Sequence, residues 1–308
     1  MIDRRTFVKS ACVTAMAPTV HQLYANLPAA DVGQHIYKSL KWGMIKAGVS
    51  TFDKFQLIKE LGFDGIELDS PDEIDKTIAR DASKQLGLPI EGIVNATHWQ
   101  IRHSDPDDNI RAQALKNMQA AMQDAHLVGA DSVLLVPGKV TDPARENHDQ
   151  VWERSIRDIR QLLPLAESLQ VRILIENVGN GFCVEPEIFA KYIDEIDSPW
   201  VGIHFDIGNH VLYRQPAEWI KVLGKRIRKL DVKDRVKGSR ELAPIGDGAV
   251  DWPAVRTALA EIGYRGWAAA EVTGGDRQHL ADVLSRMDHV LGKSDGSPAD
   301  RLPGATIG

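Results

Sequence analysis

Short apolar runs alternate with longer amphipathic stretches over most of this chain of 308 residues. Each apolar run has the length of a buried strand, and each amphipathic stretch has the period of a surface helix. Repetition of this pair is typical of a parallel sheet whose connections are helical. About eight pairs can be counted, the number that closes a TIM barrel. The predicted strands are 40–46, 65–68, 90–95, 132–136, 172–176, 201–206, 227–233 and 267–272.

Amphipathic segments separate these strands, and no linker-like segment interrupts the rhythm. We therefore predict the α/β class and a single (β/α)8 TIM barrel over residues 31–291, followed by a mobile tail, 292–308, that is rich in Gly, Pro, Ser and Asp. The predicted helices are 52–61, 72–86, 107–128, 146–168, 186–196, 216–223, 252–262 and 276–291.

The first 30 residues have the features of an export signal. Arg4 and Arg5 are followed by Phe7, Lys9 and a weak apolar run, 10–20. This order predicts a twin-arginine signal segment and export of the folded protein to the periplasm. The alternative is a chance arginine pair in an unstructured N-terminus. The apolar run is too short for a permanent membrane span.

The composition of the chain argues against some classes of function and some structural features. Hydrophobic residues make up 43% and charged residues 26% of the chain, as in ordinary globular proteins. The net charge of −6 argues against a surface for polyanions, so no nucleic-acid partner is expected. Removal of the signal would take Cys12 and leave Cys183 alone, so no intrachain disulfide is expected. The composition is compatible with a homo-oligomer.

Four acidic residues stand at or next to the ends of four predicted strands: Glu176, Asp206, Asp231 and Glu271. In a barrel the C-terminal ends of the strands form one mouth, so these side chains are expected to converge there. Buried anions repel one another unless a cation lies among them. Carboxylate oxygens suit hard ions, and the pattern predicts one divalent metal, Mg²⁺ or Mn²⁺.

The runs IENVGNGF (175–182), SPWVGIHFDIGN (198–209) and GWAAAEV (266–272) resemble the xylose-isomerase-like TIM barrels. This superfamily comprises sugar (phosphate) isomerases and epimerases, including D-tagatose and D-psicose 3-epimerases and L-xylulose-5-phosphate 3-epimerase. The resemblance implies that Glu176, Asp206 and Glu271 hold the metal, and that the two glutamates act as acid and base. At the fourth ligand position the family has His before x-Lys-Asp, whereas this chain has Asp231.

The resemblance implies proton abstraction next to the carbonyl of a keto-sugar through a metal-stabilised enediolate. Return of the proton to the opposite face gives epimerisation, and transfer to the neighbouring carbon gives isomerisation. Loss of a C1 substituent from a 3-keto-glycoside would instead make the protein a lyase or hydratase. The non-enzymatic alternative is a carbohydrate-binding barrel with a degenerate site, for which Asp231 is the main argument.

Further residues are predicted to contact the substrate. His98 follows the third strand, where the family often has a substrate-contacting His, and Asn209 takes the place of a His found in some epimerases; a surface histidine and a turn asparagine are the alternatives. Glu67 is expected to anchor the site by hydrogen bonds. Lys233 and Arg235 could bind an anion or neutralise the acids. Because export leads away from phosphorylated sugars, a free or glycosidic keto-sugar is the expected substrate.

Overall fold

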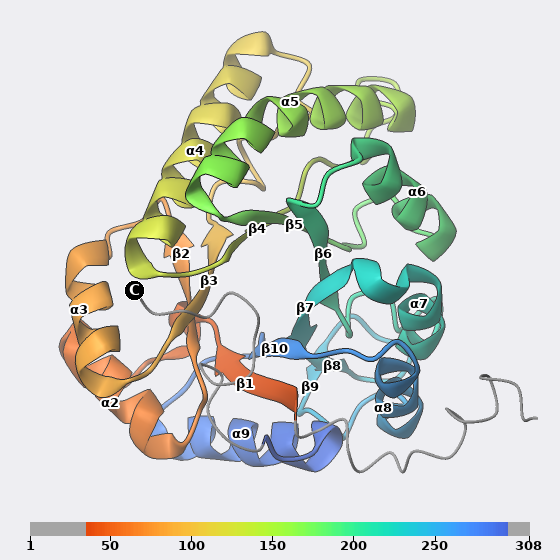
Figure 1. The fold of residues 1–308 in the computed structure, drawn as a ribbon. Helices are drawn as coiled ribbons and strands as arrows, with labels where there is room; N and C mark the ends of the chain where they lie inside the picture. Colours follow the sequence, from red (N-terminus) through yellow and green to blue (C-terminus); the bar gives the residue numbers. More distant parts are fainter. Residues whose placement is uncertain (1–34, 295–308) are drawn as a thin grey trace, which may run out of the picture.

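A computed structural model describes residues 35–294 of the chain. Within these residues, eight parallel strands form a central barrel and eight α-helices surround it, as Figure 1 shows. The predicted single (β/α)8 TIM barrel is therefore confirmed. The expected signal segment, residues 1–30, lies outside the described residues, as does the expected tail from residue 295 onward.

The barrel is closed between its first two strands. The sheet runs in the order β1-β10-β7-β6-β5-β4-β3-β2, and a parallel bridge between Lys41 and Glu67 joins its two outer strands. The backbone N–H of Asp64 also donates to Lys38 O across this seam (2.8 Å). The strands are β1 (Ile36–Leu40), β2 (Ile66–Ser70), β3 (Ile90–Asn95), β4 (Ser132–Leu135), β5 (Arg172–Glu176), β6 (Val201–Asp206), β7 (Ile227–Val232) and β10 (Gly266–Ala270).

The outer helices follow the predicted order, and their ends are set by local chemistry. Ser50 forms a capping box with Asp53 at the start of the first of them, and Gly62 ends it in the left-handed conformation with φ 95°. No helix in residues 35–294 is both long enough and apolar enough to cross a membrane. The helices are α2 (Thr51–Leu61), α3 (Lys76–Leu86), α4 (Asp108–Val128), α5 (His148–Leu169), α6 (Pro186–Ile196), α7 (Pro216–Leu223), α8 (Trp252–Glu261) and α9 (Arg277–Leu291).

Most predicted boundaries lie within two residues of those observed, but two elements differ by four residues or more. The prediction of the first strand at 40–46 is wrong, because β1 ends at Leu40 and a 3-10 helix, η3 (Trp42–Met44), follows. The true strand carries buried Lys38 and Ser39, which hid its signal. The helix predicted at 72–86 begins only at Lys76, because Asp75 caps it with its side chain.

The predicted tail starts beside the N-terminal end of the barrel. Gly292 O accepts a hydrogen bond from the buried Nζ of Lys38 on β1. The hydroxyl of Ser294 donates to Asp64 Oδ2 over 2.9 Å. These contacts place residues 292–294 against the barrel.

The lower interior of the barrel is charged. Lys229 on β7 forms an ion pair with Glu91 on β3, and its Nζ lies 3.5 Å from Glu67 Oε1 on β2. The hydroxyl of Ser39 donates to Glu91 Oε1 (2.8 Å). Gly92 leaves room for this arrangement, because a Cβ there would lie 2.1 Å from the Lys229 Nζ. Ionic pairing thus replaces part of the apolar layering that usually fills such barrels.

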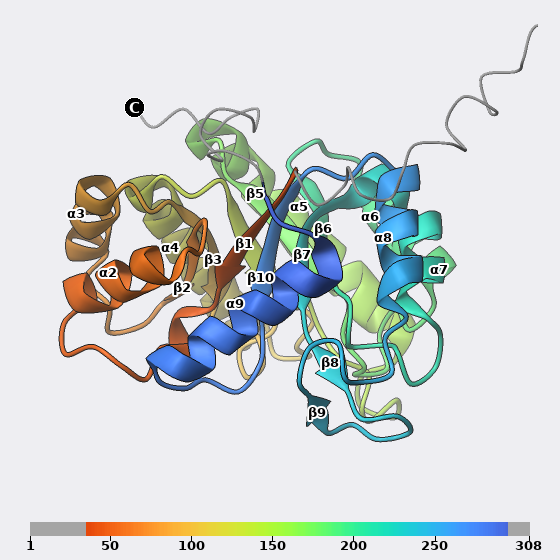
Figure 2. The ribbon, with the colours of Figure 1, turned by 90° about the horizontal axis from the view of Figure 1, so that it is seen from below.

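A short hairpin of β8 (Asp234–Arg235) and β9 (Leu242–Ala243) projects from the end of the barrel where β7 ends (Figure 2). Buried Asp234 organises the loop that leads from this hairpin to α8. A Cβ at Gly248 would come within 2.1 Å of the Asp234 carboxylate, so glycine is required there. The carboxylate accepts hydrogen bonds from the backbone N–H groups of Gly246, Gly248 and Val250 and from the indole of Trp252.

Replacement of this carboxylate should destabilise the barrel. In Asp234→Asn an amide NH₂ would face several N–H donors, and we expect the free energy of unfolding to fall by about 2–4 kcal/mol. Urea denaturation followed by circular dichroism measures this change. The control is Asp247→Asn, which removes only an exposed ion pair with Arg286 and should change stability little. Equal losses in the two variants would contradict the organising role of Asp234.

Candidate metal centre and active site

The four strand-end acids converge at the C-terminal mouth of the barrel. Glu176 and Asp206 are the last residues of β5 and β6, Asp231 lies in β7, and Glu271 follows β10. One carboxylate oxygen of each lies within 4.8 Å of the others. Asp206 and Asp231 are fully buried, whereas the Glu271 side chain is 35% exposed. Groups this close could bind one ion.

The position of Asp206 follows from local hydrogen bonds. Its backbone N–H donates to Asn177 Oδ1 (2.7 Å), and Asn177 Nδ2 donates back to Asp206 O (3.1 Å). The N–H groups of Gly208 and Asn209 then donate to Asp206 Oδ1. This leaves Oδ2 directed toward the acidic cluster, where Lys233 Nζ lies 2.5 Å away.

Two lysines lie among the four acids. Lys233 Nζ is 2.7 Å from Glu271 Oε2 as well as close to Asp206. Lys41 Nζ is 2.9 Å from Asp231 Oδ2 and 4.0 Å from Glu271 Oε1. If all four carboxylates are ionised, the two ammonium groups leave at least two negative charges (4 − 2 = 2), because Lys41 is also shared with Glu67. A dication would balance that charge.

The pKa shifts of the acids show which of them lack sufficient positive charge nearby. Burial raises the pKa of Glu176 well above its ordinary range, and the carboxylates of Glu271, Asp206 and Asp231 add to this effect. Burial also raises the pKa of Asp206 to about 7, against the opposing charge of Lys233. Burial alone would raise the pKa of Glu271, but Lys41 and Lys233 outweigh this effect and lower it.

The donor set fits a hard divalent ion. Its ligand atoms are carboxylate oxygens, the type that Mg²⁺ and Mn²⁺ prefer. A cation beside Glu176 and Asp206 would favour their charged forms, because an opposite charge lowers the pKa of a carboxyl group. Glu176, Asp206, Asp231 and Glu271 are therefore the residues that could hold the ion.

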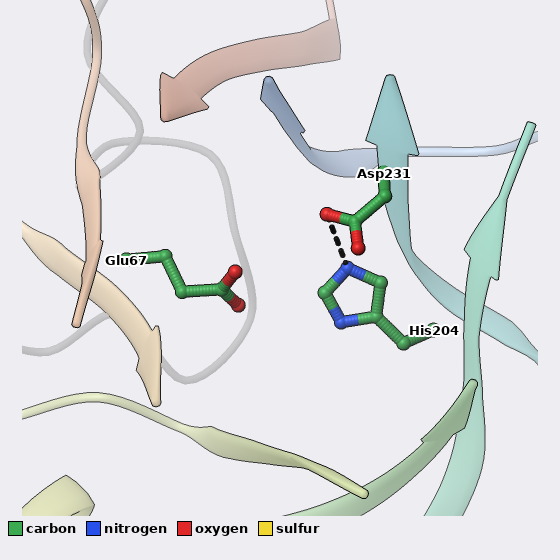
Figure 3. Close-up of side chains that lie close together, drawn as sticks. All are labelled: Glu67, His204 and Asp231. Carbon is green, nitrogen blue, oxygen red and sulfur yellow. Dashed lines mark ion pairs between the residues drawn. The ribbon is translucent and has the colours of Figure 1, made fainter. Parts of the chain in front are cut away.

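A second close set lies just beneath the first. Glu67 reaches from β2 toward the pair formed by His204 and Asp231, as Figure 3 shows. His204 Nε2 is 3.0 Å from Asp231 Oδ1, and both side chains are fully buried. The ammonium group of Lys41 contacts both acids of this set, at 3.3 Å from Glu67 Oε2 and 2.9 Å from Asp231 Oδ2. The positive charge of Lys41 thus already compensates the carboxylates of this second set.

A cavity of about 400 Å³ opens above the acids. Glu176 and Glu271 line it, whereas Asp206 and Asp231 lie below its surface. The volume is in the range of small-molecule sites. Its other polar and aromatic lining residues include Lys41, Asp69, His98, Trp99, Asn180, Asn209, Tyr213, Lys233, Arg235 and Arg240.

Four of the predicted substrate contacts line this cavity, and one does not. Asn209 Nδ2 donates to Glu176 Oε1 (3.0 Å), so this residue orients an acid of the site. Arg235 donates to Gly208 O and to Asn209 Oδ1, which leaves few of its N–H groups for a ligand. Glu67 is buried and does not line the cavity; it pairs with Lys41 and lies close to His204 and Asp231.

His98 is a neutral histidine of the cavity wall. The backbone N–H of Val136 donates to its Nδ1 (3.3 Å), which places the ring proton on Nε2. Burial lowers the pKa of His98 to about 3, and the positive charge of Lys41 contributes to the shift. The ring also meets Trp99 edge-on at a centroid distance of 5.2 Å.

Lys41 and Asn177 are the main site residues that the sequence reasoning missed. Lys41 lay inside the wrongly predicted first strand, whereas it directly follows the last residue of β1. A correct strand end would have placed it at the mouth with the acids. Asn177, next to Glu176, carried a usable signal, because short polar side chains after a strand often bond to the neighbouring backbone.

The fold and the site together define a TIM-barrel protein with an acidic cluster at its mouth. The chain belongs to the xylose isomerase-like TIM barrel family, whose model matches residues 55–288. It is 26% identical over 236 residues to the L-ribulose-5-phosphate 3-epimerase UlaE of Escherichia coli O157:H7 (strain EC4115 / EHEC), covering 72% of this chain and 82% of that protein.

Solved structures show the same fold. A D-tagatose 3-epimerase-like protein matches with a TM-score of 0.71 at 18% identity, covering 83% of this chain and 98% of that one. The 3-keto-D-glucoside 4-epimerase YcjR from E. coli matches with a TM-score of 0.69 at 18% identity, covering 82% and 99%. The match to the family model confirms, at the level of the family, the resemblance seen in the sequence.

The buried neutral His98 should make the fold sensitive to acid. Its pKa lies near 3 in the folded protein and near 6.5 in the unfolded chain, so the unfolded state binds more protons between these values. The contribution of His98 to stability is therefore lost as the pH falls below 6.5, by about 1.4 kcal/mol per pH unit.

The measurement compares urea midpoints from pH 7 to pH 4.5 in the native protein and in His98→Asn, which keeps an acceptor for Val136 N–H. We expect a shallower pH dependence in the variant. Chemical shifts of the His98 ring should also show no titration above about pH 4. A ring that titrates near pH 6.5 would contradict this interpretation.

Proposed function

We propose that this protein is a keto-sugar epimerase or isomerase that uses one divalent ion, Mn²⁺ or Mg²⁺, at the mouth of its barrel. The observation that carries the proposal is the convergence of Glu176, Asp206, Asp231 and Glu271, one carboxylate oxygen of each lying within 4.8 Å of the others. Family membership and the similarity to a named sugar 3-epimerase support the same class of reaction. An isomerase is therefore the interpretation of the site that these observations favour.

The chain supplies a pair of groups for proton transfer. Glu176 and Glu271 both line the cavity, and they come from β5 and β10, which are separated in the sheet by β6 and β7. They therefore approach a bound sugar from different sides, as removal and return of a proton on opposite faces require. The bound ion would stabilise negative charge on the carbonyl oxygen during this transfer.

The cavity favours a sugar without a phosphate group. Of its basic lining residues, Lys41 and Lys233 are paired with the acids, and Arg235 donates to backbone and side-chain oxygens. Arg240 is exposed and already donates to the Tyr213 hydroxyl (3.0 Å). Few donors are left for a phosphate, which usually recruits several. We propose a free or glycosidic keto-sugar, met in the periplasm after export through the twin-arginine route.

A lyase acting on 3-keto-glycosides is the second candidate. The exposed aromatic residues Trp99 and Tyr213 stand at the cavity wall, where a second ring of a glycoside could pack. The structural neighbour YcjR is named for a 3-keto-D-glucoside, although its likeness concerns the fold alone. Such compounds therefore belong among the substrates to be tested.

Loss of single carboxylates should abolish binding of the ion. We expect the native protein to bind one Mn²⁺ per chain, and Glu176→Gln and Asp206→Asn to bind it at least about 100-fold more weakly, since even outer partners of metal ligands are worth 10–100-fold. Titration with Mn²⁺ followed by electron paramagnetic resonance measures the affinity. Glu91→Gln, which removes a buried carboxylate far from the mouth, is the control and should bind normally. Unchanged binding in both mouth variants would refute the metal assignment.

Hydrogen exchange with solvent should identify the type of reaction. In D₂O we expect the Mn²⁺-loaded protein to introduce deuterium next to the carbonyl of at least one sugar among D-allulose, D-fructose, D-tagatose, L-ribulose and a 3-keto-D-glucoside, because proton abstraction precedes every outcome. Nuclear magnetic resonance of the recovered sugar detects the label. Release of the aglycone would identify the lyase, and no change in any sugar would favour a binding protein.

A further inference from the structure

Lys41 is held by the backbone at the seam of the barrel. Its N–H donates to Ala270 O at the end of β10 (3.3 Å), and a parallel bridge joins it to Glu67 of β2. The residue is thus fixed to both strands that flank β1. Its side chain enters the barrel from this anchored position, so the place of its ammonium group is set by the fold.

The ammonium group lies between the buried acids and the cavity. Glu67 and Asp231 hold it from below, at 3.3 and 2.9 Å, and Glu271 lies 4.0 Å away. The side chain is 14% exposed and lines the cavity beside His98. Figure 3 shows the Glu67 side chain directed toward the His204–Asp231 pair.

Lys41 is more accessible than the other lysine beside Glu67. Lys229 also pairs with Glu67, but its ammonium group lies deeper, beside Glu91, and its side chain is 3% exposed. A lysine that only neutralised Glu67 could be buried in the same way. Lys41 instead lines the cavity, so its ammonium group lies where a bound molecule could contact it.

We propose that Lys41 is a catalytic residue, whose ammonium group binds an oxygen of the keto-sugar as negative charge develops on it. The role rests on the proposed function, since it requires removal of a proton next to a carbonyl. A donor fixed in advance stabilises such charge without reorganisation, and loss of one such donor typically costs 100- to 1,000-fold in rate. Glu67 and Asp231 are then positioning residues, because they contact the ammonium group and hold it in place.

The test separates a role toward the substrate from a role toward the ion. In Lys41→Met, Mn²⁺ affinity should stay equal or increase, because a positive charge next to Asp231 and Glu271 is removed. The rate of deuterium incorporation, as kcat/KM for the best sugar of the panel above, should fall by about 100-fold or more. Lys41→Arg keeps the charge and should retain more exchange than Lys41→Met. Lys41→Gln serves as a second neutral variant if Lys41→Met does not fold.

Lys229→Met is the matched control, since it removes the other interior ammonium group beside Glu67 without touching the cavity. Its melting temperature should fall, while Mn²⁺ affinity and kcat/KM of the folded fraction should change less than about threefold, an effect below 1 kcal/mol. Unchanged exchange in folded Lys41→Met or Lys41→Gln would overturn the role of Lys41, as would loss of Mn²⁺ binding together with exchange. A native protein that binds no Mn²⁺ and labels no sugar would instead overturn the proposed function itself.

Discussion

The compensation of buried negative charge is the constraint on which the interior of this barrel depends. Carboxylates point inward from β2, β3, β5, β6 and β7 and from the end of β10. Their burial would force them to take up protons unless cations lay among them. Lys229 meets this requirement in the lower barrel, and Lys41 and Lys233 meet part of it at the mouth. The remaining negative charge at the mouth is what makes the site fit a divalent ion.

Closure of the barrel turns separate strand ends into one site. The parallel register places Asp206 beside Asp231 and Glu176 beside His204, so acids from neighbouring strands are spaced by the sheet itself. The seam between β1 and β2 brings Lys41 next to Glu67 in the same way. Rigid strands therefore carry the charged groups, while the loops carry the exposed aromatic residues of the cavity wall, Trp99 and Tyr213. Such a division allows the chemistry to be kept while the substrate changes.

The contacts of Asp231 explain how a buried carboxylate is stabilised at this position. At the position where the resemblance implies a histidine ligand, this chain has a carboxylate that contacts both His204 and Lys41. Burial would raise the pKa of Asp231, but His204 and Lys41 outweigh this effect and keep it low. The negative charge of Asp231 is thus paired with the ammonium group of Lys41.

The amino-acid sequence by itself determined the barrel, most of its element boundaries and the four acids, because strand period, capping residues and terminal glycines are local signals. It failed at β1, where buried Lys38 and Ser39 interrupt the apolar pattern, and it therefore missed Lys41. Only the tertiary structure decided which charges pair: that Glu67 holds Lys41, that Lys233 joins Asp206 to Glu271, and that Arg235 is engaged by the backbone. These partners are far apart along the chain, and no local pattern encodes a distance between strands that meet only when the barrel closes.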